Sequence, residues 1–74
     1  MGRYFSAERA THDDFGYEFT RKEGEVVYDA KTAGGPWAMM SQEAYEAFGI
    51  GKLGTGLGQK YVRNAAGELH KVEG

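Results

Sequence analysis

A dense run of glycines near the middle of the chain is the feature that most restricts its fold. Residues 49–60 read Gly-Ile-Gly-Lys-Leu-Gly-Thr-Gly-Leu-Gly-Gln-Lys, with five glycines in twelve positions. Glycine costs roughly 0.5–1 kcal/mol against alanine inside a regular helix or strand. We therefore expect this run to be a shaped structural loop, an anion-binding nest of backbone N–H groups, or a flexible binding loop.

The composition predicts one small folded domain spanning residues 1–74. Leucine, isoleucine, valine and phenylalanine are scarce, but ten aromatic residues can supply the apolar area of a thin core. The chain has no cysteine, so disulfides and thiolate metal sites are excluded. No apolar run approaches the length of a membrane span, and no secretory signal is evident, so we expect a cytoplasmic protein.

The first half of the sequence predicts a hairpin. Residues 15–20 alternate aromatic with small or polar side chains, which is typical of a half-buried strand. Residues 26–28 predict a second strand, so the hairpin spans residues 15–30. Residues 4–5 can add an N-terminal strand, and the polar residues 7–14 indicate a loop.

The second half predicts a short helix and another hairpin. Ser41 is a suitable N-cap for a helix over residues 42–48, and Gly49 suits a left-handed C-terminal cap. Residues 59–63 and 68–72 flank Asn-Ala-Ala-Gly, which is typical of a type I turn. The predicted order is β-β-β-α-β-β, an α+β fold.

Neither nucleotide binding nor catalysis is indicated by the motifs. Residues 49–54 match Gly-x-Gly-x-x-Gly, but they follow a helix where the dinucleotide motif follows a strand. His12, Asp13 and Asp14 are metal-capable, but adjacent side chains seldom converge on one ion. The chain lacks a cysteine nucleophile and any carboxylate spacing that selects an acid–base pair. We expect no enzyme, no metal and no cofactor.

Trp37 is the most informative aromatic residue. It follows residues 29–36, which have turn and loop chemistry, and precedes the expected helix. It is either a core anchor or an exposed hot spot for a partner, because tryptophan and tyrosine dominate interface energies. Tyr17 and Tyr28, on the expected strands, raise the same alternatives.

A segment containing Trp37 resembles a known family. Residues 35–38, Gly-Pro-Trp-Ala, are followed by Gly-Thr-Gly-Leu-Gly-Gln-Lys at residues 54–60. This pattern is similar to that of small zinc-ribbon-like proteins of bacteriophages, and the resemblance covers about residues 26–61. Most members of that family have no assigned activity, so the resemblance implies phage origin and a zinc-ribbon-like architecture more than a function.

The family's metal ligands are missing from this chain. Ser41 and Ala44 occupy the positions of the second metal knuckle, and the first falls near Tyr17 and Thr20. If the relationship holds, the zinc has been lost and aromatic packing has replaced it. The expected replacements are Tyr17, Tyr28, Trp37, Tyr45 and Phe48.

The resemblance and the composition together lead to a functional hypothesis. We expect a non-enzymatic phage-type protein in the cytoplasm of a bacterial host, which docks on a host or phage protein. From the resemblance to phage proteins as a class, we expect this docking to inhibit a host defence machine such as a CRISPR complex. The expected partner-binding residues are Trp37, Tyr17, Tyr28, Asp13, Asp14, Glu43 and Glu46, with the acidic groups imitating nucleic-acid phosphates.

Two alternatives stay open. The net charge of −2 argues against a basic domain. However, a local patch of Lys52, Lys60, Arg63 and Lys71, with Tyr61 for base stacking, would make a nucleic-acid-binding module. The other alternative is a structural or self-assembling phage component, which a small domain without disulfides or metal can become through oligomerisation.

Overall fold

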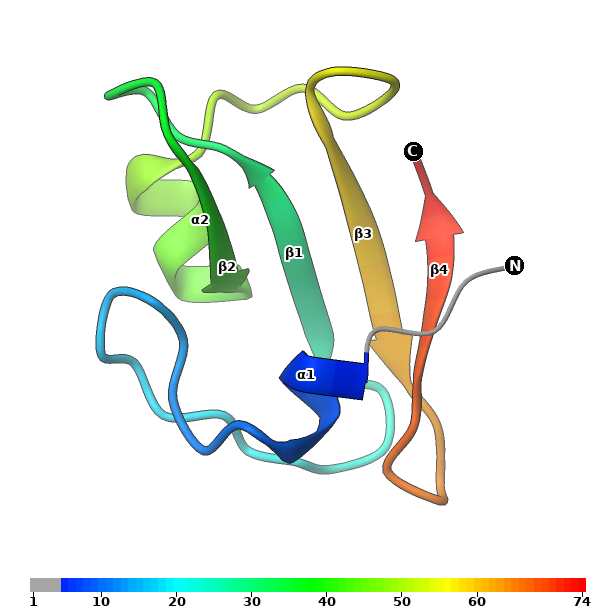
Figure 1. Ribbon diagram of the computed structural model, residues 1–74. Helices are drawn as coiled ribbons and strands as arrows, with labels where there is room; N and C mark the ends of the chain where they lie inside the picture. The colour runs from blue at the N-terminus through cyan, green and yellow to red at the C-terminus, as the bar shows by residue number, and fades with distance from the viewer. Residues whose placement is uncertain (1–4) are drawn as a thin grey trace.

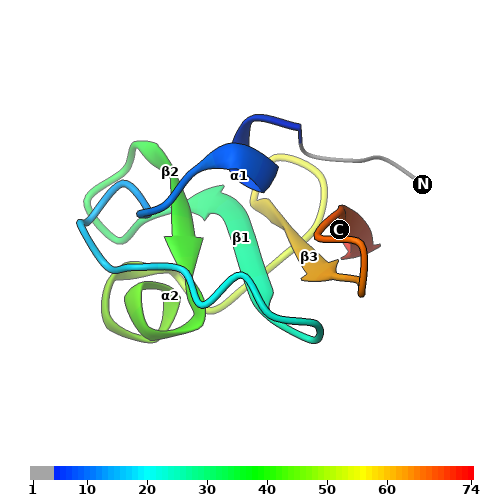
Figure 2. The ribbon, with the colours of Figure 1, turned by 90° about the horizontal axis from the view of Figure 1, so that it is seen from below.

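A four-stranded antiparallel sheet in the order β2-β1-β3-β4 forms the centre of the protein (Figure 1). The computed structural model describes residues 5–74. One short helix packs on each face of the sheet (Figure 2). The predicted small α+β fold is therefore confirmed. The elements are α1 (Phe5–Arg9), β1 (Val26–Lys31), β2 (Trp37–Ser41), α2 (Gln42–Phe48), β3 (Gly58–Arg63) and β4 (Leu69–Glu73).

The core has two parts, one on each face of the sheet, because successive strand side chains point to opposite faces. On the α1 side, Ala7 packs with a cluster of Phe19, Val27, Tyr61 and Leu69. On the α2 side, Ala44 packs with Tyr28, Ala30 and Met40. The rings of Tyr28 and Tyr45 stack in parallel there, with centroids 3.8 Å apart. The core is thus thin and partly aromatic, as the composition predicts.

The N-terminal third differs from the sequence prediction. The strand expected over residues 15–20 is absent, and only an isolated bridge between His12 and Glu18 forms there. Phe5 begins helix α1, which runs into the segment predicted as a loop; Tyr4 lies outside the described residues. The chain from residue 10 to 25 has no regular structure, and Figure 1 shows it looping beside β2 at the left and then running along the lower end of the sheet.

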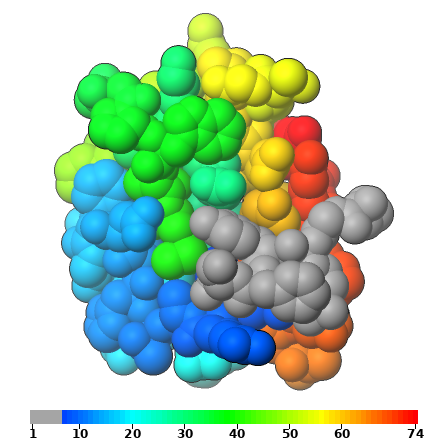
Figure 3. Space-filling view, viewed as in Figure 1, coloured from blue at the N-terminus to red at the C-terminus, as the bar shows by residue number. Residues whose placement is uncertain are grey.

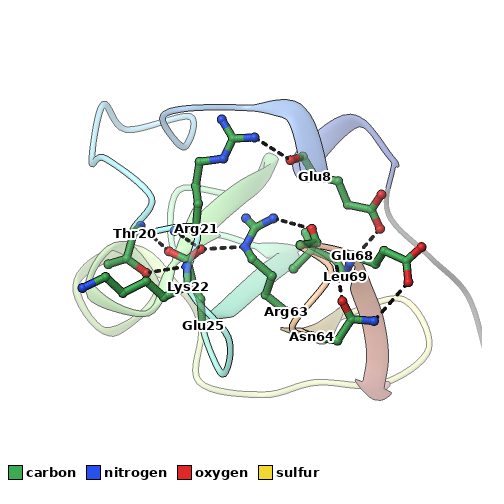
Figure 4. Close-up of polar contacts among 10 residues, drawn as sticks. Glu8, Thr20, Arg21, Lys22, Glu25, Arg63, Asn64, Glu68 and Leu69 are labelled. Carbon is green, nitrogen blue, oxygen red and sulfur yellow. Dashed lines mark hydrogen bonds and ion pairs between the residues drawn. The ribbon is translucent and has the colours of Figure 1, made fainter.

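Carboxylates organise that irregular segment in place of a strand partner. Glu25 accepts the backbone N–H groups of Thr20 (2.7 Å) and Arg21 (2.9 Å). Its Oε1 also pairs with Nε of Arg63 on β3 at 3.0 Å (Figure 4). Arg63 donates further to the carbonyl oxygen of Gly67 (2.8 Å). Side-chain carboxylates thus satisfy backbone N–H groups that a strand would satisfy by pairing.

The first hairpin forms between β1 and β2, one element later than predicted. The turn between them closes because both the N–H and the hydroxyl of Thr32 donate to the carbonyl oxygen of Pro36, at 2.9 and 2.7 Å. Trp37 is therefore the first residue of an edge strand and does not lie at a loop-to-helix junction. The same turn is tied to the end of α2, where Ala33 N–H donates to the carbonyl oxygen of Phe48 (2.8 Å).

The second hairpin and the helix cap are confirmed. β3 and β4 pair across a tight turn in which Gly67 N–H donates to the carbonyl oxygen of Asn64 (3.0 Å). The Ser41 hydroxyl caps α2 by accepting Ala44 N–H. The left-handed cap predicted at Gly49 is wrong, because its φ is −76°. Glycine is needed there for space: a Cβ would lie 2.5 Å from a ring carbon of Tyr45.

The glycine run forms a shaped turn that leads into β3. Gly54 and Gly58 exchange both backbone hydrogen bonds, at 2.8 and 3.0 Å, which closes a five-residue loop. Gly54 has a φ of +131°, a region that other residues rarely adopt. A Cβ on Gly58 would overlap the side chain of Ala30 on the neighbouring strand. Backbone shape and close approach both explain the glycines.

Replacing Arg63 tests the buried ion pair. Arg63 is 1% exposed, so Arg63→Ala leaves the Glu25 carboxylate without its cation in a buried site. We expect a loss of about 3–5 kcal/mol in the free energy of unfolding, measured by urea denaturation. Lys71→Ala, a partly exposed position on β4, is the control. A loss below about 1 kcal/mol for Arg63→Ala would contradict a structural role.

Alanine substitutions distinguish a glycine required by close packing, Gly49, from a glycine without close neighbours, Gly34. In Gly49→Ala the new methyl group collides with the Tyr45 ring, so we expect about 1–3 kcal/mol of destabilisation. In Gly34→Ala the nearest atoms are 3.9 Å away and the backbone needs no positive φ, so we expect a change within about 0.5 kcal/mol. Equal melting temperatures for the two variants would show that the close packing at Gly49 is incorrect.

Candidate functional site

Three exposed aromatic side chains line one groove beside the start of β2. Trp37 is 44% exposed, Phe15 40% and Phe48 39%. The groove has a volume of about 540 Å³, and its other walls come from the β1–β2 turn and the last turn of α2. Phe15 and Phe48 stack on each other, with centroids 4.3 Å apart and an interplanar angle of 12°. Large side chains gathered at the surface in this way are typical of a binding site.

Each aromatic side chain is held by a different part of the fold. Phe48 ends α2, whose terminus is bonded to the β1–β2 turn. Trp37 pairs with Lys31 of β1. Phe15 lies in the irregular segment, and its position depends on Asp13. In Figure 3 that segment, in blue, borders the green atoms of β2 at the left edge of the face shown.

Asp13 is a buried carboxylate that joins the irregular segment to the start of α2. Its Oδ1 accepts the N–H groups of Phe15 and Tyr17, both at 2.9 Å. Its Oδ2 accepts the N–H and the hydroxyl of Ser41, also at 2.9 Å. Burial alone would raise the pKa of Asp13, but these hydrogen bonds outweigh it and hold the pKa below its ordinary value.

The outer edge of β2 is only partly covered. Asp14 N–H donates to the carbonyl oxygen of Met39 (2.9 Å), and Asp14 Oδ2 accepts Met39 N–H (2.7 Å). Because backbone groups alternate in direction along a strand, those of Trp37 point to the same outer side as those of Met39. No hydrogen bond from the described residues reaches the N–H or carbonyl oxygen of Trp37, so this stretch of edge is open at the groove.

The groove carries negative charge. Among the described residues, Asp14 is the one charged residue in its lining. Asp29, opposite Met39 on β1, lies on the same face of the sheet as Trp37. Burial, followed by the charge of Asp14, raises the pKa of Asp29. The two carboxylates are thus close enough to repel each other, and no hydrogen bond or ion pair within residues 5–74 reaches the Asp29 carboxylate.

Only part of the predicted partner-binding set lies at this groove. Trp37 and Asp14 line it. Tyr28 and Asp13 are 5% and 6% exposed, so the prediction that they face a partner is wrong. Tyr17 is half-buried against the core on the α2 side. Two further residues, Glu43 and Glu46, are exposed on α2 outside the groove lining.

Phe15 and Phe48 are the site residues that sequence reasoning missed. Phe15 falls within the strand predicted over residues 15–20, and Phe48 is one of the aromatic residues predicted to pack in place of the metal. The Phe48 side chain is exposed because α2 ends at this residue, beyond the edge of the sheet. The Asp-Asp-Phe-Gly sequence at residues 13–16 is the signal that could have placed Phe15 at the surface. Aspartate and glycine are typical turn residues, and Phe15 lies between them.

The predicted basic patch does not assemble. Arg63 is buried, and Tyr61 is 6% exposed within the core on the α1 side, so neither can bind or stack on a surface ligand as predicted. Lys71 is opposite Tyr61, whereas Lys60 is opposite Tyr28, so these two lysines lie on opposite faces of the sheet. Lys52 and Lys60 are the remaining cations near the glycine run.

Neither a metal site nor a membrane span is found in the part of the chain that the structure describes. Nowhere in residues 5–74 do three His, Asp or Glu side chains gather as metal ligands. No helix in this range is long and apolar enough to cross a membrane. Comparison of the chain with known protein families, curated proteins and solved structures found no match. The zinc-ribbon resemblance therefore stays a prediction.

Asparagine at residue 13 tests the carboxylate junction. Asp13→Asn keeps one acceptor oxygen and places an NH₂ group among donors, so we expect a loss of about 1.5–3 kcal/mol in stability at neutral pH. Glu43→Gln, an exposed acidic position, is the matched control.

The pH dependence gives a second measurement of the same junction. A depressed pKa in the folded state stabilises the protein above about pH 4, and this contribution is lost as the pH falls through the folded-state pKa. The stability difference between wild type and Asp13→Asn should therefore shrink in acid. A difference independent of pH would contradict the junction.

Proposed function

We propose that the protein is a small non-enzymatic binding protein that docks on a partner protein through the groove of Phe15, Trp37 and Phe48. The observation that carries this proposal is the fixed exposure of three large aromatic side chains around one groove. A domain with so thin a core would gain stability by burying large aromatic side chains. Here Phe15, Trp37 and Phe48 lie outside the core. Aromatic residues held at the surface in this way provide the hot spots of protein interfaces.

The polar groups of the chain support binding more than catalysis. Ser41, whose hydroxyl contacts Asp13 at 2.9 Å, is buried and serves as the cap of α2. Asp14, the carboxylate that lines the groove, accepts the Met39 N–H at the edge of β2. We therefore assign the acidic residues Asp14, Glu43 and Glu46 to partner recognition. Asp13 is removed from the proposed contact surface and given a structural role.

The identification as a phage protein in a bacterial cytoplasm rests on the resemblance of residues 26–61 alone. The resemblance to phage proteins as a class extends the proposal to inhibition of a host defence machine such as a CRISPR complex. The partner in that case is a host protein. Nucleic-acid binding through Lys52 and Lys60 has weaker support, because the other predicted cations do not lie with them.

A displayed library of random peptides tests groove docking. Immobilised protein should enrich peptides whose affinity falls at least about tenfold on Phe48→Ser or Trp37→Ser, since hot-spot residues contribute about 2 kcal/mol or more. Val72→Ser is the matched control, because Val72 is 55% exposed and lies outside the groove. Circular dichroism checks that each variant folds.

Two outcomes would contradict the proposal. One is a library that yields no binder, and the other is a set of binders that lose as much affinity on Val72→Ser as on the groove variants. Titration with single- and double-stranded DNA at low salt addresses the alternative. Tight binding that weakens steeply with salt and on Lys52→Gln would favour a nucleic-acid-binding module.

A further inference from the structure

We infer that the occupant of the groove is an extended protein segment that places an arginine beside an apolar side chain, with its backbone along β2 and its guanidinium at Asp14. This inference rests on the proposed docking function and specifies the partner's chemistry. It depends on three features of the groove: an open strand edge, aromatic walls, and unneutralised negative charge.

The open edge of β2 favours a partner segment with an extended backbone. Asp14 already pairs with Met39 as an added strand residue would, through one N–H and one carboxylate oxygen. Two residues away along β2, the outward N–H and carbonyl oxygen of Trp37 have no such partner within residues 5–74. An extended segment that continues along this edge would supply both hydrogen bonds, which is the strand-addition mode of peptide recognition.

The walls call for an apolar side chain. Trp37 and the stacked pair of Phe15 and Phe48 face the groove together with Pro36 and Ala47. This lining leaves little for a polar side chain to bond with, apart from Asp14. A branched aliphatic side chain placed against these rings would remove apolar surface of both molecules from water.

The negative charge at the groove favours a partner segment that carries a cation. Asp14 is exposed and accepts one hydrogen bond, through Oδ2, so its Oδ1 has no partner within residues 5–74. Asp29 adds a second negative charge nearby. Lys31, opposite Trp37 on β1, forms no ion pair with either carboxylate. Among cations, arginine fits best because its planar guanidinium can bond a carboxylate and stack on an aromatic face at once.

Other occupants fit less well. A nucleic-acid phosphate would meet Asp14 and no cation in the lining. A second copy of this chain would place an arginine of its own at the groove, and within residues 5–74 the exposed arginines are Arg9 and Arg21. Light scattering distinguishes that case, because the chain would then associate in the absence of any peptide.

Capped pentapeptides of sequence Ala-Leu-Arg-Leu-Ala test the inference. Their counterparts carry citrulline or glutamate in place of arginine, so that shape is kept or charge is reversed. Trp37 is the single tryptophan of the chain and reports binding by its fluorescence. Backbone amide NMR shifts at Trp37 and Asp14 then locate the peptide. We expect the citrulline peptide to bind about tenfold more weakly than the arginine peptide, and the glutamate peptide more weakly still.

Single substitutions test whether Asp14 causes the preference for arginine over citrulline. Asp14→Asn keeps an oxygen that accepts Met39 N–H, so the fold is retained while the charge is removed. We expect this variant to lose the preference for arginine over citrulline, whereas Glu23→Gln, at an exposed position outside the groove lining, keeps it. The comparison of peptides on the wild-type protein needs no variant, so the test holds even if Asp14→Asn unfolds.

The outcomes separate the inference from the function on which it rests. Equal binding of all three peptides at the groove would leave groove docking intact and overturn the arginine assignment. Retention of the arginine preference in Asp14→Asn would also overturn it. If none of the peptides binds, or if the shifts map outside the groove, both groove docking and the arginine assignment are contradicted. A protein that self-associates through the groove would replace the peptide occupant with a second copy.

Discussion

The buried carboxylate of Asp13 is the interaction on which the rest of the structure depends. It accepts four hydrogen bonds from two segments that are far apart in the sequence, the chain around residues 15–17 and Ser41 at the junction of β2 and α2. Without it, residues 15–17 would lose their link to the start of α2, and the irregular segment would be held to the sheet by Asp14 and Glu25. Under the proposed relationship to zinc-ribbon-like proteins, Tyr17 and Ser41 would be knuckle positions, and the carboxylate would join residues that a metal joins there.

The sequence predicts the local elements well and the long-range ones poorly. The cap at Ser41, the turn at Asn64 to Gly67 and strand β1 follow from residue types close together in the chain. The alternating residues 15–20 have a strand pattern, but a strand needs a partner, and β1 pairs instead with β2 and β3. Which carboxylate binds which backbone N–H depends on tertiary proximity, which no local pattern contains.

The same limit applied to the candidate site. Trp37 could be selected from the sequence because tryptophan is enriched among interface hot spots, and Asp14 because an acidic group can imitate a nucleic-acid phosphate. Arg63 could not be recognised as buried, because its partner Glu25 is 38 positions away in the chain. Phe15 and Phe48 come together only after the irregular segment folds back beside α2. Composition thus indicated a surplus of aromatic residues, and the tertiary structure determined which of them are exposed.

The way the irregular segment is attached has a consequence for how this fold can diversify. Its backbone is anchored at Asp13 and Glu25, and no strand register passes through the residues between them. Substitutions at Phe15, which is exposed and lies outside the core clusters, therefore leave the pairing of the four strands untouched, whereas Phe19 in the same segment is a core residue. Because Phe15 forms one wall of the groove, such changes would alter recognition independently of the scaffold, much as variable loops do on other rigid frameworks.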